Sequence, residues 1–287
     1  FSEDALRILR AVRFSAQLDF SIEEATAGAI RTLASSLEKI SAERIRTELT
    51  KLLLSDHPEM IGDACKLGIT KVILPEWDAM VGVRQNTKHH FFDVDRHTLQ
   101  ALKNIRADKV LRFTMLFHDM GKPSMKTTDE AGTDHFKGHA LVSEEIARTV
   151  MRRLKFDNET VRKVTRLVCY HDYRAAATPR NVRRAMNRIS EELFPLYLEV
   201  RMADICAQSE YRREEKIRNI LEMKDIYHQI LEEGDCVTIR QLAVNGRDLT
   251  ALGMQPGKEI GDMLNELLEM VIDDPEKNRK EILCAYV

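Results

Sequence analysis

Apolar residues recur at helical spacing along most of the chain, and the clearest run lies in the segment 109–123, KVLRFTMLFHDMGKP. Six of the eight residues from 110 to 117 are apolar, which predicts a helix that is buried nearly all round. His118 and Asp119 follow at its end, where Gly121 suits a C′ position and Pro123 suits a helix stop. A hydrogen-bonded histidine beside an exposed aspartate would explain such a pair equally well. Because a second His-Asp pair stands at 171–172, partners elsewhere have to decide what this pair does.

The segment before position 77 predicts a small helical domain. Ser2 is expected to cap the first helix and Ser41 the third, since a side-chain oxygen there can accept from unpaired amides. Ser21 and Glu24 have the spacing of a capping box for the second helix. A fourth helix is expected between positions 58 and 68.

Helical periodicity resumes after a loop-like stretch and continues to the end of the chain. Helices are predicted over 139–154, over 158–171, from the Thr178-Pro179 cap signal onward, and over 210–233, which Gly234 ends. The segment TTDEAGTDHFKG is predicted to be a polar loop. No strand signal is stronger than VTIRQLAV at 237–244, so the sequence predicts an all-α protein.

Composition sets loose limits on this picture. The length of 287 residues favours two or three packed units, and the formal net charge of −2 indicates no particular partner. Five cysteines lack C-x-x-C spacing, which favours reduced thiols and a cytoplasmic setting. No apolar run approaches the roughly 18 residues of a membrane span. Because the first residue is Phe1 rather than methionine, we expect a fragment that lacks an N-terminal partner domain.

Polar residues that interrupt apolar helices in the middle of the chain are the candidate chemistry. Asp204 is the most informative, because it stands among Met202, Ala203, Ile205 and Cys206 and an acid in such company needs a partner or a metal. Five further residues come from other predicted helices, as in the metal sites of helical bundles. They are His97, His118, Asp119, His139 and His171. His97 could equally be a plain core histidine.

Imidazole and carboxylate ligands suit a divalent cation, and Mg, Mn, Ni, Co, Fe and Zn all remain open. Such a site would support metal-assisted phosphoester hydrolysis. Lys122 would be placed to meet a phosphate, although a solvated surface lysine explains it equally well.

The order His97, His118-Asp119, Asp204 resembles the H…HD…D signature of the HD superfamily of metal-dependent phosphohydrolases, with GHALVSEE and LVCYHDY similar to its intermediate helices. That resemblance implies that these four residues bind the metal. It also implies that His139 and His171 serve the substrate phosphate or a second metal, and it is the reason to treat them, with Lys122, as catalytic candidates.

The flanking segments resemble bacterial CCA-adding tRNA nucleotidyltransferases and their poly(A) polymerase relatives. SEDALRILRAVRFSAQLDFSIEEAT and SAERIRTEL are similar to the neck of that family, and NGRDLTALGMQPGKEIGDMLNELLE to its C-terminal tail. The resemblance implies that Asp4 and Arg7 read the base of the incoming CTP or ATP. Arg10 continues the same three-residue spacing, and a solvated basic face would explain the three residues as well. One turn separates Asp4 from Arg7, so an ion pair between them is expected.

The resemblance also implies a division into three parts. They are a neck domain over 1–76, an HD domain over 77–209 and a tRNA-binding tail over 210–287. Family members carry an N-terminal head with a Gly-Ser motif and an Asp-x-Asp pair, which this sequence lacks. Nucleotide addition is therefore not expected from this chain alone.

Basic residues gather between Arg148 and Arg188, opposed within that segment only by Asp157, Glu159 and Asp172. This local excess suits phosphate contacts, as tRNA binding requires, and a set of solvated helix faces is the alternative. The residues taken as RNA-binding are Arg152, Arg153, Arg180, Arg183 and Arg184.

The sequence therefore predicts part of a tRNA nucleotidyltransferase that carries an HD phosphohydrolase site. Two alternatives stay open: an RNA-binding scaffold whose HD residues are relics, and a free-standing HD nucleotidase. The metal, the phosphoester substrate and the oligomeric state are left open. The sequence also does not distinguish CCA-adding, A-adding, CC-adding and poly(A)-adding parents.

Overall fold

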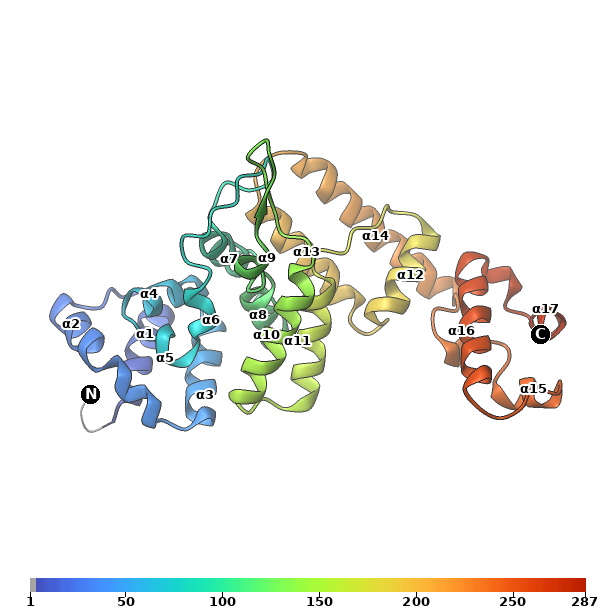
Figure 1. The fold of residues 1–287 in the computed structure, drawn as a ribbon, viewed down its shortest axis with the longest axis horizontal. Helices are drawn as coiled ribbons and strands as arrows, with labels where there is room; N and C mark the ends of the chain where they lie inside the picture. The colour runs from blue at the N-terminus through green and yellow to red at the C-terminus, as the bar shows by residue number, and fades with distance from the viewer. Residues whose placement is uncertain (1–3) are drawn as a thin grey trace. The chain divides into compact units, whose positions relative to one another are not determined.

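The computed structural model describes residues 4–287 and is built from helices, with one two-stranded hairpin among the described residues (Figure 1). The predicted all-α class is confirmed. The described chain forms two compact units. The first contains the residues up to Tyr173 together with Glu199–Lys216, and the second contains Arg174–Leu198 together with Ile217–Val287. The predicted boundaries at positions 76 and 209 stay a prediction.

The first unit begins with short helices around an apolar core. They are α1 (Leu6–Leu18), α2 (Glu24–Leu33), η1 (Ala34–Lys39), α3 (Ala42–Leu53), η2 (Pro58–Met60), α4 (Ile61–Lys66), α5 (Thr70–Ile73) and α6 (Pro75–Asp78). Ser41 caps α3 as predicted, and its hydroxyl accepts from the Arg44 amide.

The predicted cap of the second helix differs from the structure. The cap of α2 is Glu23 rather than Ser21, because the Glu23 carboxylate reaches the amides of Ala25 and Thr26 at 2.9 Å. Ser2, the expected cap of α1, lies outside the described residues; α1 begins at Leu6, whose amide donates to the Asp4 carboxylate.

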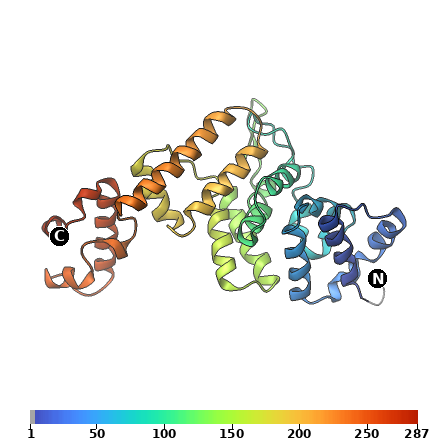
Figure 2. The ribbon, with the colours of Figure 1, turned by 180° about the vertical axis from the view of Figure 1, so that it is seen from behind.

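The rest of the first unit is a helical bundle that carries the polar cluster. Its elements are α7 (Val94–Lys103), α8 (Lys109–Phe117), α9 (Lys122–Met125), α10 (His139–Arg153), α11 (Asn158–Tyr170) and the second half of α13 (Phe194–Ala207). Helices α10 and α11 form an antiparallel pair, seen from behind in Figure 2. The loop TTDEAGTDHFKG is a hairpin instead of irregular chain, since β1 (Thr127–Thr128) pairs with β2 (Asp134–His135).

Gly121 has a different role from the one its sequence position suggested. Its φ is −80°, so it is not a left-handed C′ residue, and Pro123 lies in the first turn of α9 rather than ending α8. A Cβ built on Gly121 would lie 2.4 Å from the carbonyl oxygen of His139 and 2.7 Å from the Ser143 amide. Glycine is required here because the backbone of α10 passes against it.

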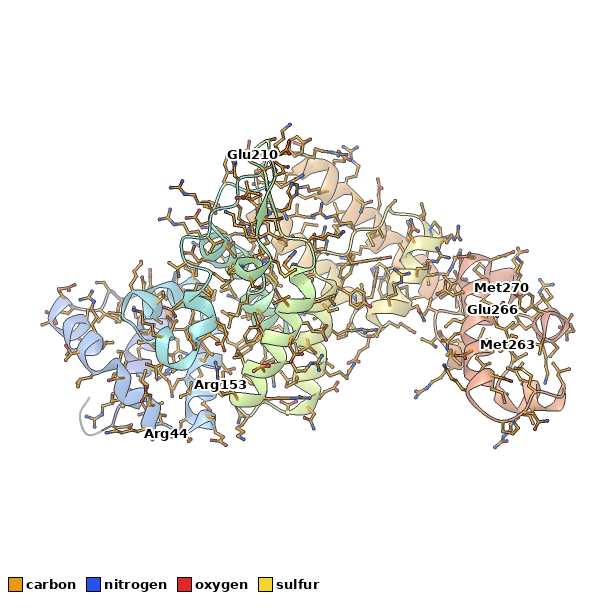
Figure 3. The ribbon with its side chains drawn as sticks, in the orientation of Figure 1. Arg44, Arg153, Glu210, Met263, Glu266 and Met270 are labelled. Carbon is orange, nitrogen blue, oxygen red and sulfur yellow. The ribbon has the colours of Figure 1, made fainter. Side chains whose placement is uncertain are left out.

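The second unit contains α12 (Pro179–Ile189), most of α14 (Arg213–Glu233), η3 (Ile239–Gln241), α15 (Gly246–Ala251), α16 (Lys258–Asp273), η4 (Pro275–Lys277) and α17 (Lys280–Tyr286). Thr178 caps α12 with Pro179 in the first turn, as predicted. The segment VTIRQLAV folds around η3 instead of forming a strand, and Val237, Leu242 and Val244 enter the apolar core against α16. Figure 3 labels Met263, Glu266 and Met270 on α16. Among the described residues no helix is long and apolar enough to cross a membrane.

Candidate metal centre

Four buried histidines converge in the first unit, and each is fixed by a hydrogen bond from one ring nitrogen to the backbone. The Nδ1 atoms of His118, His139 and His171 lie 2.7–2.8 Å from the carbonyl oxygens of residues 115, 136 and 168. Nδ1 of His97 lies 3.2 Å from the carbonyl oxygen of residue 207. A carbonyl oxygen only accepts, so each Nδ1 carries the proton and each Nε2 keeps a free lone pair in the neutral ring.

The Nε2 atoms face one another across short distances. Nε2 of His97 lies 3.3 Å from Nε2 of His118, and Nε2 of His139 lies 3.1 Å from Nε2 of His171. Two lone pairs at this separation repel unless a proton or a cation lies between them. The donor set therefore fits divalent cations held by nitrogen and oxygen.

Asp119 joins the two histidine pairs. Its Oδ2 lies 3.2 Å from Nε2 of His118 and 3.5 Å from Nε2 of His97, while its Oδ1 lies 3.3 Å from Nε2 of His139 and 3.6 Å from Nε2 of His171. Two ligand groups result, His97-His118-Asp119 and Asp119-His139-His171, and each is compact enough to hold one ion. Neither Asp119 oxygen accepts a hydrogen bond of ordinary geometry from a histidine, and Oδ2 also lies 2.7 Å from the Lys122 ammonium.

Asp204, on α13, lies beside His97 of the first group. Its Oδ1 lies 3.0 Å from Nε2 of His97, and its Oδ2 accepts from the Gln208 amide at 2.9 Å and faces Arg201 at 3.5 Å. One oxygen is thus aimed at the histidines while the other is held from behind. Arg201 also donates to the carbonyl oxygen of His171. The sequence reading missed Gln208 and Arg201, although both lie within one turn of Asp204.

Lys122 is buried, with 5% of its surface exposed, so the reading as a solvated surface lysine is wrong. Its ammonium lies 2.7 Å from Oδ2 of Asp119 and 2.7 Å from Oε1 of Gln85. A buried ammonium beside the carboxylate supplies a positive charge next to both ligand groups.

Burial and charge act in opposite directions on the ionisable groups of the centre. Burial tends to raise the pKa of Asp119, but the charges of His118 and Lys122 outweigh it and hold that pKa well below its usual range. Burial lowers the pKa of His171. Asp119 is therefore an anion and His171 a neutral ring at neutral pH. For His118, burial tends to lower the pKa, but the charge of Asp119 outweighs it and raises that pKa.

His90 is a further residue near the centre that the sequence reading did not single out. Its ring meets the His97 ring edge-on, with 5.0 Å between centroids, and its buried Nδ1 has no hydrogen-bond partner in the described chain. Burial and the charge of Lys122 lower the pKa of His90 to about 2, so the ring is neutral. The HHFF run at 89–92 was the available signal for it.

Of the candidate nucleotide-binding residues, Asp4 lies just before α1, and Arg7 and Arg10 are exposed on α1. Asp4 pairs with Arg44 of α3 at 3.1 Å, and the Arg10 guanidinium lies 3.6 Å from the Glu48 carboxylate. Arg44 is labelled in Figure 3. Arg7 is exposed on the same helix, and its expected ion pair with Asp4 stays a prediction.

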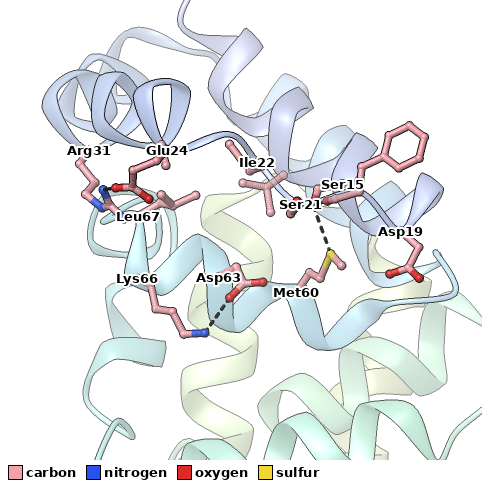
Figure 4. A pocket seen from close by; sticks show the side chains of 13 residues that line it. Ser15, Asp19, Ser21, Ile22, Glu24, Arg31, Met60, Asp63, Lys66 and Leu67 are labelled. Atoms are coloured by element: carbon pink, nitrogen blue, oxygen red, sulfur yellow. Dashed lines mark hydrogen bonds and ion pairs between the residues drawn. The ribbon is translucent and has the colours of Figure 1, made fainter.

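A cavity of about 510 Å³ opens between α1, α2 and α4 (Figure 4). Its charged lining is largely self-neutralised, since Arg31 pairs with Glu24 at 2.8 Å and Lys66 pairs with Asp63 at 2.8 Å. This lining does not point to a particular reaction.

The five arginines taken as RNA-binding occupy different environments. Arg152 and Arg153 are exposed at the end of α10, and Arg153, labelled in Figure 3, pairs with Glu76 at 2.7 Å. In the second unit Arg180 pairs with Asp273 at 2.7 Å, and Arg184 lies 2.8 Å from the same carboxylate.

Arg183 is buried, with 6% of its surface exposed. It donates to Asp235 at 2.9 Å and to the carbonyl oxygen of Ile272 at 2.7 Å. Acidic residues from distant segments therefore balance much of the local positive charge. Arg183 is held by contacts within the second unit rather than presented to solvent.

Comparison with known proteins places two segments of the chain in described families. Residues 136–287 match the family described as "tRNA nucleotidyltransferase domain 2 putative", and residues 19–81 match "Probable RNA and SrmB- binding site of polymerase A". The chain is 34% identical over 279 residues to a CC-adding tRNA nucleotidyltransferase of Thermus thermophilus, with 93% of the chain and 62% of that relative covered.

Two further relatives agree with this. The chain is 32% identical over 281 residues to an A-adding tRNA nucleotidyltransferase of Deinococcus radiodurans, with 93% of the chain and 64% of that relative covered. A multifunctional CCA protein of Neisseria gonorrhoeae is 37% identical over 177 residues, which are 59% of the chain and 42% of that relative. The chain thus spans less than two thirds of the length of these relatives.

Proposed function

Because the chain belongs to the tRNA nucleotidyltransferase family, we propose that it serves an enzyme that completes tRNA 3′ ends and carries a separate metal-dependent phosphohydrolase centre in its first unit. The observation that carries the second part is the position of Asp119 between two histidine pairs whose Nε2 lone pairs all face inward. A relic would be expected to have lost ligands, and here each position of the signature is occupied.

The residues of the centre have distinct roles in this proposal. His97, His118, Asp119 and Asp204 would hold one cation. His139 and His171 would either hold a second cation together with Asp119 or contact the substrate phosphate. A bound divalent cation would polarise a phosphoryl oxygen and activate water at neutral pH.

Lys122 binds and neutralises a phosphate oxygen from a buried position beside Asp119, where its charge acts with little screening. Gln208 and Arg201 fix the Asp204 carboxylate, and the four backbone carbonyls fix the imidazole tautomers.

The transferase part of the proposal assigns the neck residues to the nucleotide. Asp4, Arg7 and Arg10 would contact the base of CTP or ATP, since a carboxylate and a guanidinium offer an acceptor and donors at a fixed spacing. The exposed Arg152, Arg153 and Arg180 and the half-buried Arg184 would contact tRNA phosphates. In the whole protein, Arg7→Ala should abolish selective addition of C and A to tRNA, while Arg31→Ala, on the neighbouring helix, should leave it intact.

The phosphohydrolase part is tested by metal analysis of the purified protein, followed by assays on cyclic and 3′-phosphorylated nucleotides with each candidate metal. We expect bound metal, hydrolysis and loss of both in Asp119→Ala. Asp63→Ala is the control, because this aspartate belongs to the same unit but is 50% exposed and pairs with Lys66 at 2.8 Å on α4. Activity that survives Asp119→Ala would refute the assignment. Absence of both metal and activity would favour the relic site on an RNA-binding scaffold.

A further inference from the structure

The loop of residues 84–92, RQNTKHHFF, touches the metal centre with its inner side. Gln85 accepts a hydrogen bond from the Lys122 ammonium at 2.7 Å and donates to the carbonyl oxygen of Phe92. The His90 ring packs edge-on against the metal-ligand candidate His97. The loop is therefore continuous with the site of the proposed hydrolysis.

The same loop presents aromatic rings to solvent on its outer side. Phe91 is 74% exposed, the largest exposed fraction of any large hydrophobic side chain in the described chain, and Phe92 is 37% exposed. Tyr211 is 45% exposed and meets the His89 ring edge-on, with 5.1 Å between centroids. We name this set, His89, Phe91, Phe92 and Tyr211, the aromatic rim.

Several hydrogen bonds hold the aromatic rim in place. The Ser209 amide donates to the carbonyl oxygen of His89 at 2.9 Å, and the Ser209 hydroxyl donates to the carbonyl oxygen of Lys88 at 2.6 Å. The Lys216 ammonium lies 3.3 Å from Nδ1 of His89. The exposed rings thus stand on a backbone tied at two points, which lowers the entropy that a ligand must overcome.

The charge of the loop selects among the molecules that such rings could contact. Residues 84–92 include Arg84 and Lys88 and no acidic residue, whereas the whole chain has a formal net charge of −2. Exposed aromatic rings interleaved with cations are typical of surfaces that bind single-stranded nucleic acid, where bases stack and phosphates pair. An apolar peptide would not need the cations.

We infer that the aromatic rim stacks the base of the penultimate nucleotide, one position upstream of the nucleotide whose phosphate is bound at the metal centre, so that the centre acts on RNA ends in preference to mononucleotides. This inference rests on the proposed phosphohydrolase function and extends it to the substrate class. Phe91 is the specificity-determining residue, because it is the most exposed ring of the rim.

The test compares a 3′-phosphorylated mononucleotide with a 3′-phosphorylated dinucleotide of the same terminal base. Hydrolysis is measured as kcat/KM and binding by calorimetry, for the wild-type protein, Phe91→Ala, Phe91→Trp and the control Phe20→Ala. Phe20 is 64% exposed and lies in the neck, away from loop 84–92, so it matches Phe91 in type and exposure.

We expect the wild-type protein to prefer the dinucleotide about tenfold, within the range that one stacked base contributes. Phe91→Ala should lower kcat/KM for the dinucleotide to the value for the mononucleotide, and Phe91→Trp and Phe20→Ala should keep the tenfold preference. Equal kcat/KM values for the two substrates in the wild-type protein, or an equal loss on both in Phe91→Ala, would overturn the inference.

The two proposals fail in different ways. If neither the wild-type protein nor any variant hydrolyses either compound, the phosphohydrolase proposal fails. Binding of the two unhydrolysed compounds to the aromatic rim can then still be measured by calorimetry. A tenfold tighter dissociation constant for the dinucleotide that is lost in Phe91→Ala would then support stacking alone. Equal dissociation constants would refute it.

Discussion

Replacing Gly121 with alanine should destabilise the first unit because the structure leaves no room for a methyl group. The new Cβ would lie 2.4 Å from the His139 carbonyl oxygen, 2.7 Å from the Ser143 amide nitrogen and 2.9 Å from Cβ of Val142. All three atoms belong to α10 or its start, and two of them are backbone. An ordinary contact needs roughly 3.4 Å, so the start of α10 would have to move by about 1 Å.

Two costs add in this variant. Overpacking of a buried contact costs about 1–3 kcal/mol, and the Gly121 amide, which donates to the buried Ser143 hydroxyl at 2.8 Å, would be pulled from its partner at about 1 kcal/mol. We therefore expect Gly121→Ala to lower the free energy of unfolding by about 3 kcal/mol. In a unit of this size that corresponds to a melting temperature lower by roughly 6–12 °C.

The assay uses the fluorescence of Trp77, the one tryptophan of the sequence, which is buried in the first unit. Gly28→Ala is the control, because Gly28 lies inside α2 with no atom within 4 Å of the added methyl group. It should be neutral or stabilise by about 1 kcal/mol through helix propensity. Equal melting temperatures for wild type and Gly121→Ala would refute the close-approach reading of this glycine.

Two further predictions concern a cap and a supporting residue. Asp157 caps α11 by accepting from the Thr160 amide at 2.8 Å. Asp157→Ala should therefore lower the free energy of unfolding by about 1 kcal/mol, measured by thermal unfolding, whereas Asp157→Asn should retain most of the stability of the wild type. Hydrogen bonds from the Thr160 amide and hydroxyl lower the pKa of Asp157 to about 2, so this difference should be constant above about pH 4 and vanish as the pH falls towards 2. Gln208→Leu should weaken metal binding about 10- to 100-fold in a chelator competition, because Oδ2 of Asp204 loses its hydrogen-bond donor. The control Gln229→Leu, at an exposed position, should leave the affinity unchanged. Unchanged metal affinity in Gln208→Leu would contradict the support of Asp204 by Gln208.

The polar residues that the structure brings together at the candidate centre could be picked out from the sequence because each one breaks a local rule. His118 and Asp119 end an apolar helix, and Asp204 stands among apolar neighbours on α13. Such violations are expensive unless a partner compensates them, so they mark the places where a site must form. The order of these residues along the chain, which resembles the H…HD…D signature, then grouped them into one candidate site.

The supporting residues could not be predicted in the same way, since their roles depend on segments far apart in the chain. Gln85 lies 37 residues from Lys122, and Gly121 is glycine only because α10 passes it. Serine is the commoner cap and therefore favours Ser21 for α2, yet it is the Glu23 carboxylate that accepts from the free amides. Sequence patterns describe one helix or loop at a time, whereas the roles of Gln85 and Gly121 depend on contacts between two segments.

The surface charge of the basic segment 148–188 could not be predicted from its sequence alone either. Its sequence has few acids, but in three dimensions Glu76 reaches Arg153, Asp273 reaches Arg180 and Asp235 reaches Arg183. Charge summed along a segment therefore overestimates the positive potential of the folded surface, because salt bridges to other segments neutralise part of it. Phosphate binding by this region must depend on the residues that stay exposed, such as Arg152 and Arg166, rather than on the count of arginines.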